Sequence, residues 1–240
     1  MAQPMSQPEE PYRRGMVVFA HADDAEWGCS GTVAKWCAEG WEVVYVVCTD
    51  GSKGSGDPTM SSAKLAEIRR QEQLNAAKVL GLLNVVFLQY EDSMLEPTLD
   101  LRRDITREIR RHKPDVLICE SPIRRLSYNG YLSHPDHIAA GEAAMAAVFP
   151  SARDRLTFPE LLEEGLEPHK VREVWVMDPH EADNYVDVTA YIEVAINALK
   201  QHATQVDSED VSAQMKGWRS RTGEKVGFQY AEAFKRFHLS

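Results

Sequence analysis

Short apolar runs alternate with longer segments of helical periodicity along most of the chain. The runs typical of β-strands are MVVFA (16–20), EVVYVVC (42–48), NVVFL (84–88), DVLIC (115–119) and VREVWVM (171–177). The spacing of apolar residues elsewhere predicts helices near 30–39, 62–80, 99–112, 136–148, 189–203 and 224–237. Gly40, Gly81 and Pro114 mark the ends of the first three of these helices.

Strands that alternate with helices are typical of right-handed β-α-β units, which form a parallel sheet. We therefore predict an α/β fold, with a doubly wound, Rossmann-like and mostly parallel sheet of order 3-2-1-4-5 and helices on both faces. In this order the chain reverses direction between strands 1 and 4, and a crevice opens at their carboxyl ends. Residues 1–14, polar and rich in proline, are expected to form a flexible tail, and residues 15–240 a single domain.

Composition and charge restrict the possible partners. Asp and Glu number 37 against 27 Lys and Arg, and the resulting net charge of −10 argues against nucleic acid as a partner. No apolar run reaches the roughly 20 residues of a membrane span, and the N-terminus lacks the apolar core of a signal peptide. The four cysteines form no C-x-x-C pair, which favours reduced thiols. We expect a cytoplasmic protein without a membrane span.

Two polar clusters follow strands 1 and 4. HADD (21–24) comes directly after the first strand, and HPDH (134–137) follows the fourth after a loop. Each cluster alone has a structural explanation: Asp24 as a helix cap, or Pro135 as the first residue of a helix. However, the predicted strand order brings both clusters to one crevice, and His134 and His137, three residues apart, share a helix face.

Two imidazoles and a carboxylate are the usual protein ligands of a catalytic zinc ion. Spacing alone leaves the three ligands open among His21, Asp23, Asp24, His134 and His137. Asp23 and Asp24 are neighbours whose side chains diverge, so one would bind the metal and the other would activate water. The two clusters therefore predict a metal-dependent hydrolase.

At these residues the chain resembles the LmbE-like, or PIG-L, family of zinc-dependent N-acetylglucosaminyl deacetylases. The family motif A-H-P-D-D-x-E stands here as AHADDAE (20–26), with Ala22 in place of the usual proline, and H-P-D-H is intact. Arg69 and Glu72 match the family's R-x-x-E helix, and Asp92 occupies its sugar-contacting position. The segments 186–205 and 227–237 resemble the family's D-[IV]-T helix and its C-terminal Y-A-E-x-F.

The resemblance implies roles for single residues. The ligands of one Zn²⁺ per chain, or of another divalent transition metal, would be His21, Asp24 and His137. Asp23 would be the general base, and His134, oriented by Asp136, would stabilise the oxyanion or act as an acid. Arg69 and Asp92 would contact the substrate; the structural alternatives for them are a solvated helix face and a loop carboxylate.

The implied reaction removes the N-acetyl group from a small glycoside that contains N-acetylglucosamine, giving acetate and a free amine. An alternative with the same metal site is an amidase that acts on a thiol–sugar conjugate or another amide. The family also implies a homo-oligomer. The aglycone stays open, as does the choice between Asp23 and His134 as the group that protonates the leaving amine.

Other classes of protein agree less well with the sequence. GSKGSG (51–56) follows a strand, but the lysine–hydroxyl pair of a phosphate loop does not follow Gly56. Cys29 near a helix start would suit a cysteine hydrolase, although packing explains it better. A non-catalytic binding subunit is a further alternative. Glu26, Glu72 and His202 are expected to be structural. Loop 50–61 is either a rim over the site or a plain connection, and segment 149–170 covers the site or meets a neighbouring subunit.

Overall fold

A computed structural model describes residues 11–126, 132–206 and 210–239. The predicted tail, residues 1–14, lies mostly outside these ranges, and its last residue, Arg14, already belongs to the first strand. Cys29, Cys37, Cys48 and Cys119 are free thiols. No helix within the described ranges is both long enough and apolar enough to cross a membrane.

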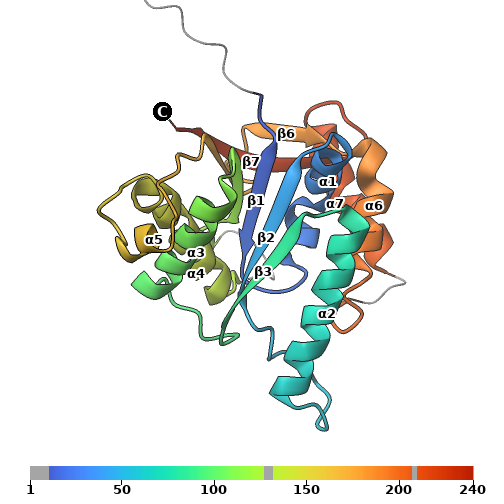
Figure 1. Cartoon of the computed structure of the whole chain (residues 1–240). Coiled ribbons are helices and arrows are strands. Elements are labelled where there is room, and N and C mark those ends of the chain that lie inside the picture. The colour runs from blue at the N-terminus through green and yellow to red at the C-terminus, as the bar shows by residue number, and fades with distance from the viewer. Residues whose placement is uncertain (1–10, 127–131, 207–209, 240) are drawn as a thin grey trace, which may run out of the picture.

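A seven-stranded sheet of order β3-β2-β1-β4-β5-β7-β6 forms the centre of the fold (Figure 1). Its first five strands are parallel, which confirms the predicted order 3-2-1-4-5. These strands are β1 (Arg14–Phe19), β2 (Glu42–Thr49), β3 (Asn84–Tyr90), β4 (Val116–Glu120) and β5 (Glu173–Met177). The antiparallel strands β7 (Ala231–His238) and β6 (Asn184–Asp187) extend the sheet beyond β5.

Helices cover both faces of the sheet, as predicted (Figure 1). One face carries α3 (Leu99–His112) and α4 (Pro135–Ala146), which continues into a π-helical turn, Ala147–Ser151. The other face carries α1 (Asp24–Ala38), α2 (Ser62–Leu80) and α6 (Ile192–Leu199), with α7 (Val211–Glu224) packed on α6. The remaining helical pieces are short, namely α5 (Glu160–Glu163) and a 3-10 turn, Thr189–Tyr191.

The predicted helix at 224–237 is wrong. Helix α7 ends at Glu224, and residues 231–238 form strand β7. Residues such as Ala231, Glu232 and Lys235 do not by themselves demand a strand, but pairing with β5 and β6 overrides their local preference. The buried Glu232 carboxylate also accepts hydrogen bonds from two amides of α1, and this anchors the strand.

Segment 149–170 packs against α3. The guanidinium of Arg110 donates to the carbonyl oxygens of Ser151 (2.9 Å), Asp154 (2.8 Å) and Thr157 (3.0 Å). Side chains in this segment also pair with α3, because Glu164 accepts from Arg107 at 3.0 Å. These contacts are with α3, so they do not support the expectation that the segment covers the site.

The carboxyl ends of β1 and β4 lie side by side, with Val18 opposite Cys119. Helix α4 approaches this edge closely because residue 141 is glycine: a Cβ at Gly141 would lie 2.4 Å from the carbonyl oxygen of Glu120. The adjacency of β1 and β4 brings the segments after them together, and the close approach of α4 sets the position of its first residues.

Candidate metal centre

Three side chains from the two polar clusters form a compact triangle of donors, in which Asp24 faces each histidine with a different carboxylate oxygen. Nδ1 of His21 lies 3.2 Å from Oδ2 of Asp24 and 3.3 Å from Nε2 of His137. That same Nε2 lies 3.2 Å from Oδ1 of Asp24. Ligand atoms bonded at about 2.0–2.1 Å to a tetrahedral zinc ion are about 3.3–3.4 Å apart. The spacing of these donors therefore fits one divalent ion.

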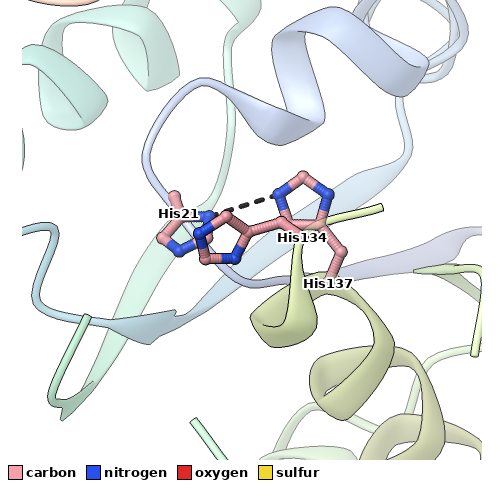
Figure 2. Close-up of side chains that lie close together, drawn as sticks. All are labelled: His21, His134 and His137. Atoms are coloured by element: carbon pink, nitrogen blue, oxygen red, sulfur yellow. Dashed lines mark hydrogen bonds between the residues drawn. The ribbon is translucent and has the colours of Figure 1, made fainter. Parts of the chain in front are cut away.

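Figure 2 shows the rings of His21, His134 and His137 close together, the first from the loop after β1 and the others from the start of α4. Their ring centroids are 4.7–5.4 Å apart. His134 is the N-cap of α4, and its Nδ1 accepts the amide hydrogen of Asp136 at 3.2 Å. The neutral His134 ring therefore carries its proton on Nε2.

Carboxylates contact the opposite nitrogen of each triangle histidine. Nε2 of His21 lies 3.2 Å from both Asp136 and Asp92, and Nδ1 of His137 lies 3.3 Å from Glu120. Such carboxylate–histidine pairs orient the ring and fix the nitrogen that faces a metal. Here they leave Nδ1 of His21 and Nε2 of His137 to face each other across the triangle.

The electrostatics of the cluster favour a shared positive charge. Burial opposes protonation of His21, but hydrogen bonds with Asp136 and Asp24 outweigh burial and raise its pKa to about 12. Burial likewise opposes protonation of His137, while Asp24 and Glu120 raise its pKa to about 9. Two facing imidazole nitrogens bordered by carboxylates require a proton or a metal ion between them. The donor set therefore fits a divalent cation.

Asp23 and Asp24 have different environments, as their diverging side chains require. The Asp24 carboxylate accepts the amide hydrogen of His21 at 2.7 Å, and neither aspartate caps α1 through its side chain, so the helix-cap interpretation is wrong. Asp23 borders the cavity instead. Burial and the Asp24 charge raise the pKa of Asp23 to about 7, although Arg69 and His202 oppose this shift.

A polar cavity of about 220 Å³ opens beside the triangle. Five of the residues singled out from the sequence line it: His21, Asp23, Arg69, Asp92 and His134. Burial opposes ionisation of Asp92, but contact with His21 outweighs burial and lowers its pKa. All eight predicted site residues therefore lie in or directly behind one cavity, with His137 and Asp24 in the triangle and Asp136 behind His21.

Asp136 was expected to orient His134, but its carboxylate is closer to other groups. It accepts the amide hydrogen of Ser93 at 2.7 Å and lies 3.2 Å from Nε2 of His21. Its distance to Nδ1 of His134 is 3.8 Å, so the amide of Asp136 makes the shorter contact with that ring. The carboxylate thus ties the loop after β3 to His21.

Sequence reasoning missed Glu120, the last residue of β4. Its Oε2 accepts the amide hydrogen of Ala20 at 2.9 Å, and its Oε1 faces His137. Burial and the Asp24 charge raise the pKa of Glu120 to about 8, against the effect of His137. An acidic residue at the end of the strand that leads to HPDH was the available signal.

The cavity has four further lining residues that were not predicted singly: Lys53, Gly54, Ser93 and Gln205. The first two belong to loop 50–61, so this loop forms part of the rim. Cys29 is fully buried in α1, and burial raises its pKa well above its usual range. A nucleophilic cysteine needs a lowered pKa, because the thiolate is the reactive form, so this environment does not suit a cysteine hydrolase.

Comparisons with known proteins agree with this geometry. The model of the PIG-L family, described as GlcNAc-PI de-N-acetylase, matches residues 16–148. Diacetylchitobiose deacetylase of Thermococcus kodakarensis is 29% identical over 235 residues, which cover 96% of this chain and 85% of that protein. A deacetylase of 1D-myo-inositol 2-acetamido-2-deoxy-alpha-D-glucopyranoside from Mycobacteroides abscessus is 28% identical, over 85% of each chain.

One solved structure is similar to this chain over nearly its whole length. N,N'-diacetylchitobiose deacetylase from Pyrococcus horikoshii, complexed with its inhibitor MPG, superposes with a TM-score of 0.87 at 28% identity. The match covers 98% of this chain and 87% of that one. Since the family model alone spans more than half of the sequence, the chain belongs to the PIG-L family of deacetylases, as its two motifs indicated.

Proposed function

We propose that this protein is a zinc-dependent de-N-acetylase that hydrolyses the acetamide of a small N-acetylglucosamine-containing glycoside. The products are acetate and a free amine. The donor triangle of His21, Asp24 and His137, with sides of 3.2–3.3 Å beside a polar cavity, is the observation that carries the proposal. Deacetylase activity on acetylated amino sugars, named for the relatives above, supports the same substrate class.

Zinc is the metal that this donor set suits best, because two imidazoles and one carboxylate leave a fourth tetrahedral position open. His21 would bind through Nδ1, His137 through Nε2 and Asp24 through its carboxylate. A bound zinc ion supplies a Lewis acid for the acetamide carbonyl and lowers the pKa of water to about 7. Glu120, Asp92 and Asp136 hold the two rings in the orientation that this binding requires.

Asp23 is the general base in this proposal. It takes a proton from the attacking water as the water oxygen bonds to the acetamide carbon. His134, with its proton on Nε2, donates a hydrogen bond to the oxyanion that forms. Cleavage of the C–N bond then requires a proton on the leaving nitrogen, and the one held by Asp23 is available to it. A positioned base contributes about 10²–10⁴-fold to such reactions.

Arg69 and Asp92 are proposed to contact the sugar hydroxyls. Both are almost completely buried, line the cavity and lie 3.6 Å apart. A buried acidic and basic pair offers both acceptors and donors to the hydroxyls of a sugar. Lys53, which lines the cavity and pairs with Glu91 at 2.9 Å, would meet the aglycone.

The test is primary-amine release from a panel of N-acetylglucosamine glycosides, assayed before chelation, after chelation and after addition of Zn²⁺. We expect release that chelator abolishes and zinc restores. Release that is insensitive to chelator would contradict the metal mechanism. No release by protein with one bound zinc ion would contradict the glycoside substrate, and thiol–sugar conjugates would then be assayed as the alternative amide.

A further inference from the structure

A tight turn carries Asp23 to the cavity. The amide of Asp24 donates to the carbonyl of His21 at 3.2 Å, so Ala22 and Asp23 are the central residues of a β-turn. Asp23 has φ 95° and ψ −24°, close to the third position of a type II turn. That position favours glycine or asparagine. An aspartate there is strained, and such strain persists only where the surroundings hold it.

The strain has an obvious route of release. Type I and type II turns differ by a rotation of the central peptide group through roughly 180°, and in type I the third residue has an ordinary φ of about −90°. Rotation of the Ala22–Asp23 peptide would therefore relieve Asp23. It would also redirect the Asp23 side chain, which the proposed reaction needs at the cavity.

Helix α2 holds both polar groups of this peptide. Nη2 of Arg69 donates to the carbonyl oxygen of Ala22 at 2.8 Å, and the amide of Asp23 donates to Oε1 of Gln73 at 3.4 Å. Arg69 and Gln73 are four residues apart, so they lie on the same face of the helix. Rotation of the peptide would reverse its carbonyl and its N–H and would lose both hydrogen bonds.

The Gln73 amide is itself held in one orientation. Its side chain is fully buried, and its Nε2 donates to Oε1 of Glu26 at 3.0 Å. The other oxygen of Glu26 lies 3.2 Å from Nε2 of His202, and both residues are completely buried. With Nε2 directed at Glu26, Oε1 of Gln73 faces the turn. An unpaired buried amide would be costly, which maintains this arrangement.

We propose that Gln73 is a positioning residue: with Arg69, it keeps the Ala22–Asp23 peptide in the type II orientation and the Asp23 carboxylate at the cavity. The inference rests on the proposed function, because it assigns Gln73 an effect only through the general base. Arg69 also contacts the cavity directly, so Gln73, which does not line it, is the residue on which the effect can be measured separately.

The test compares Gln73→Met with Gln71→Met on a glycoside that the wild type deacetylates. Gln71 lies on the same helix and is exposed, and its side-chain amide donates to Oδ1 of Asn75 at 2.9 Å. We expect Gln73→Met to lower kcat about 10- to 100-fold, with KM and zinc content within twofold of wild type, and Gln71→Met to retain activity. An unchanged kcat, or a loss of zinc equal to the loss of kcat, would overturn the proposal.

A double-mutant cycle with Asp23→Asn separates positioning from general damage. If Gln73 acts through Asp23, adding Gln73→Met to Asp23→Asn will leave the residual activity unchanged. A further loss of the same size as in the wild-type background would contradict the proposal. A wild type that binds zinc but deacetylates nothing would instead refute the proposed function, so the two failures are distinguishable.

A second pair of variants keeps the test valid if Gln73→Met does not fold. Gln73→Glu places two carboxylates against each other, whereas Glu26→Gln with Gln73→Glu restores a donor and keeps an acceptor for the amide of Asp23. We expect the double variant to recover kcat at least tenfold over Gln73→Glu. Equal kcat values for the two would overturn the proposal.

Discussion

At the scale of single residues, the site depends on groups that orient other groups. Asp24 contacts both His21 and His137, whereas Glu120 contacts the far nitrogen of His137 and accepts the amide hydrogen of Ala20. Glu120 is buried, so above its pKa of about 8, where it is ionised, its charge acts on the imidazole with little screening by water. The affinity for zinc should therefore depend on Glu120, although it is not among the proposed ligands.

We expect Glu120→Gln to weaken zinc binding about 10- to 100-fold. The amide has nearly the same shape as the carboxylate, but it presents no negative charge to Nδ1 of His137. The affinity is measured above pH 8, where Glu120 is ionised, by competition with a chromophoric chelator, and Glu163→Gln, an exposed change in α5, is the control. Equal affinities for Glu120→Gln and wild type would refute this role.

At the scale of elements, tertiary contacts reverse what helix propensity predicts. Gly31 lies inside α1, where alanine would normally stabilise a helix by roughly 0.5–1 kcal/mol. However, a Cβ at Gly31 would be 2.8 Å from Cβ of Val188 and 3.1 Å from Oε1 of Glu232. Glycine is required here because α1 packs directly against Val188, the residue after β6, and against Glu232 of β7.

We expect Gly31→Ala to lower the free energy of unfolding by about 1–3 kcal/mol, as in an overpacked core. Gly217→Ala in α7 is the matched control, because its nearest contact would be the end of the Arg221 side chain at 3.7 Å. This control should raise the free energy of unfolding by roughly 0.5–1 kcal/mol. Urea unfolding measures both, and a shift of the same sign in the two variants would contradict the packing argument.

At the scale of the whole molecule, the parallel and antiparallel parts of the sheet are joined at β5 and β7. Glu173 on β5 is buried and accepts hydrogen bonds from Arg236 on β7 (2.7 Å) and from Trp175 (2.7 Å). Burial opposes ionisation of Glu173, but these hydrogen bonds outweigh burial and lower its pKa. The ion pair therefore stabilises the joined sheet while Glu173 is ionised.

A lowered pKa in the folded state gives stability that is complete above the unfolded-state value, about 4.3, and is lost as pH falls through the folded value. We expect Glu173→Gln to lower the urea midpoint at pH 7, and the difference from wild type to shrink below about pH 4. Glu42→Gln, an exposed change at the start of β2, is the control. A difference that stays constant from pH 7 to pH 3.5 would show that ionisation of Glu173 is not the cause.

Much of the fold was predictable from local patterns, because parallel strands buried on both faces are continuous apolar runs. MVVFA and EVVYVVC are such runs, and both became adjacent strands. The C-terminal strand was not predictable in this way. Residues 231–238 carry helix-forming residues as well as aromatic ones, and only pairing with β5 and β6 decides between the two.

The candidate site also has a part that local sequence patterns predict and a part that only tertiary contacts decide. Both histidine–aspartate motifs and the sheet order follow from the sequence, because short spacing and β-α-β handedness are local or nearly local properties. Contacts between residues far apart in the chain needed the tertiary structure: Glu120 with Ala20, Gln73 with Asp23, and Glu26 with His202. Such contacts join separate elements, and no spacing in the sequence encodes them. The sequence thus determined which residues carry the chemistry, and packing decided which residues hold them in place.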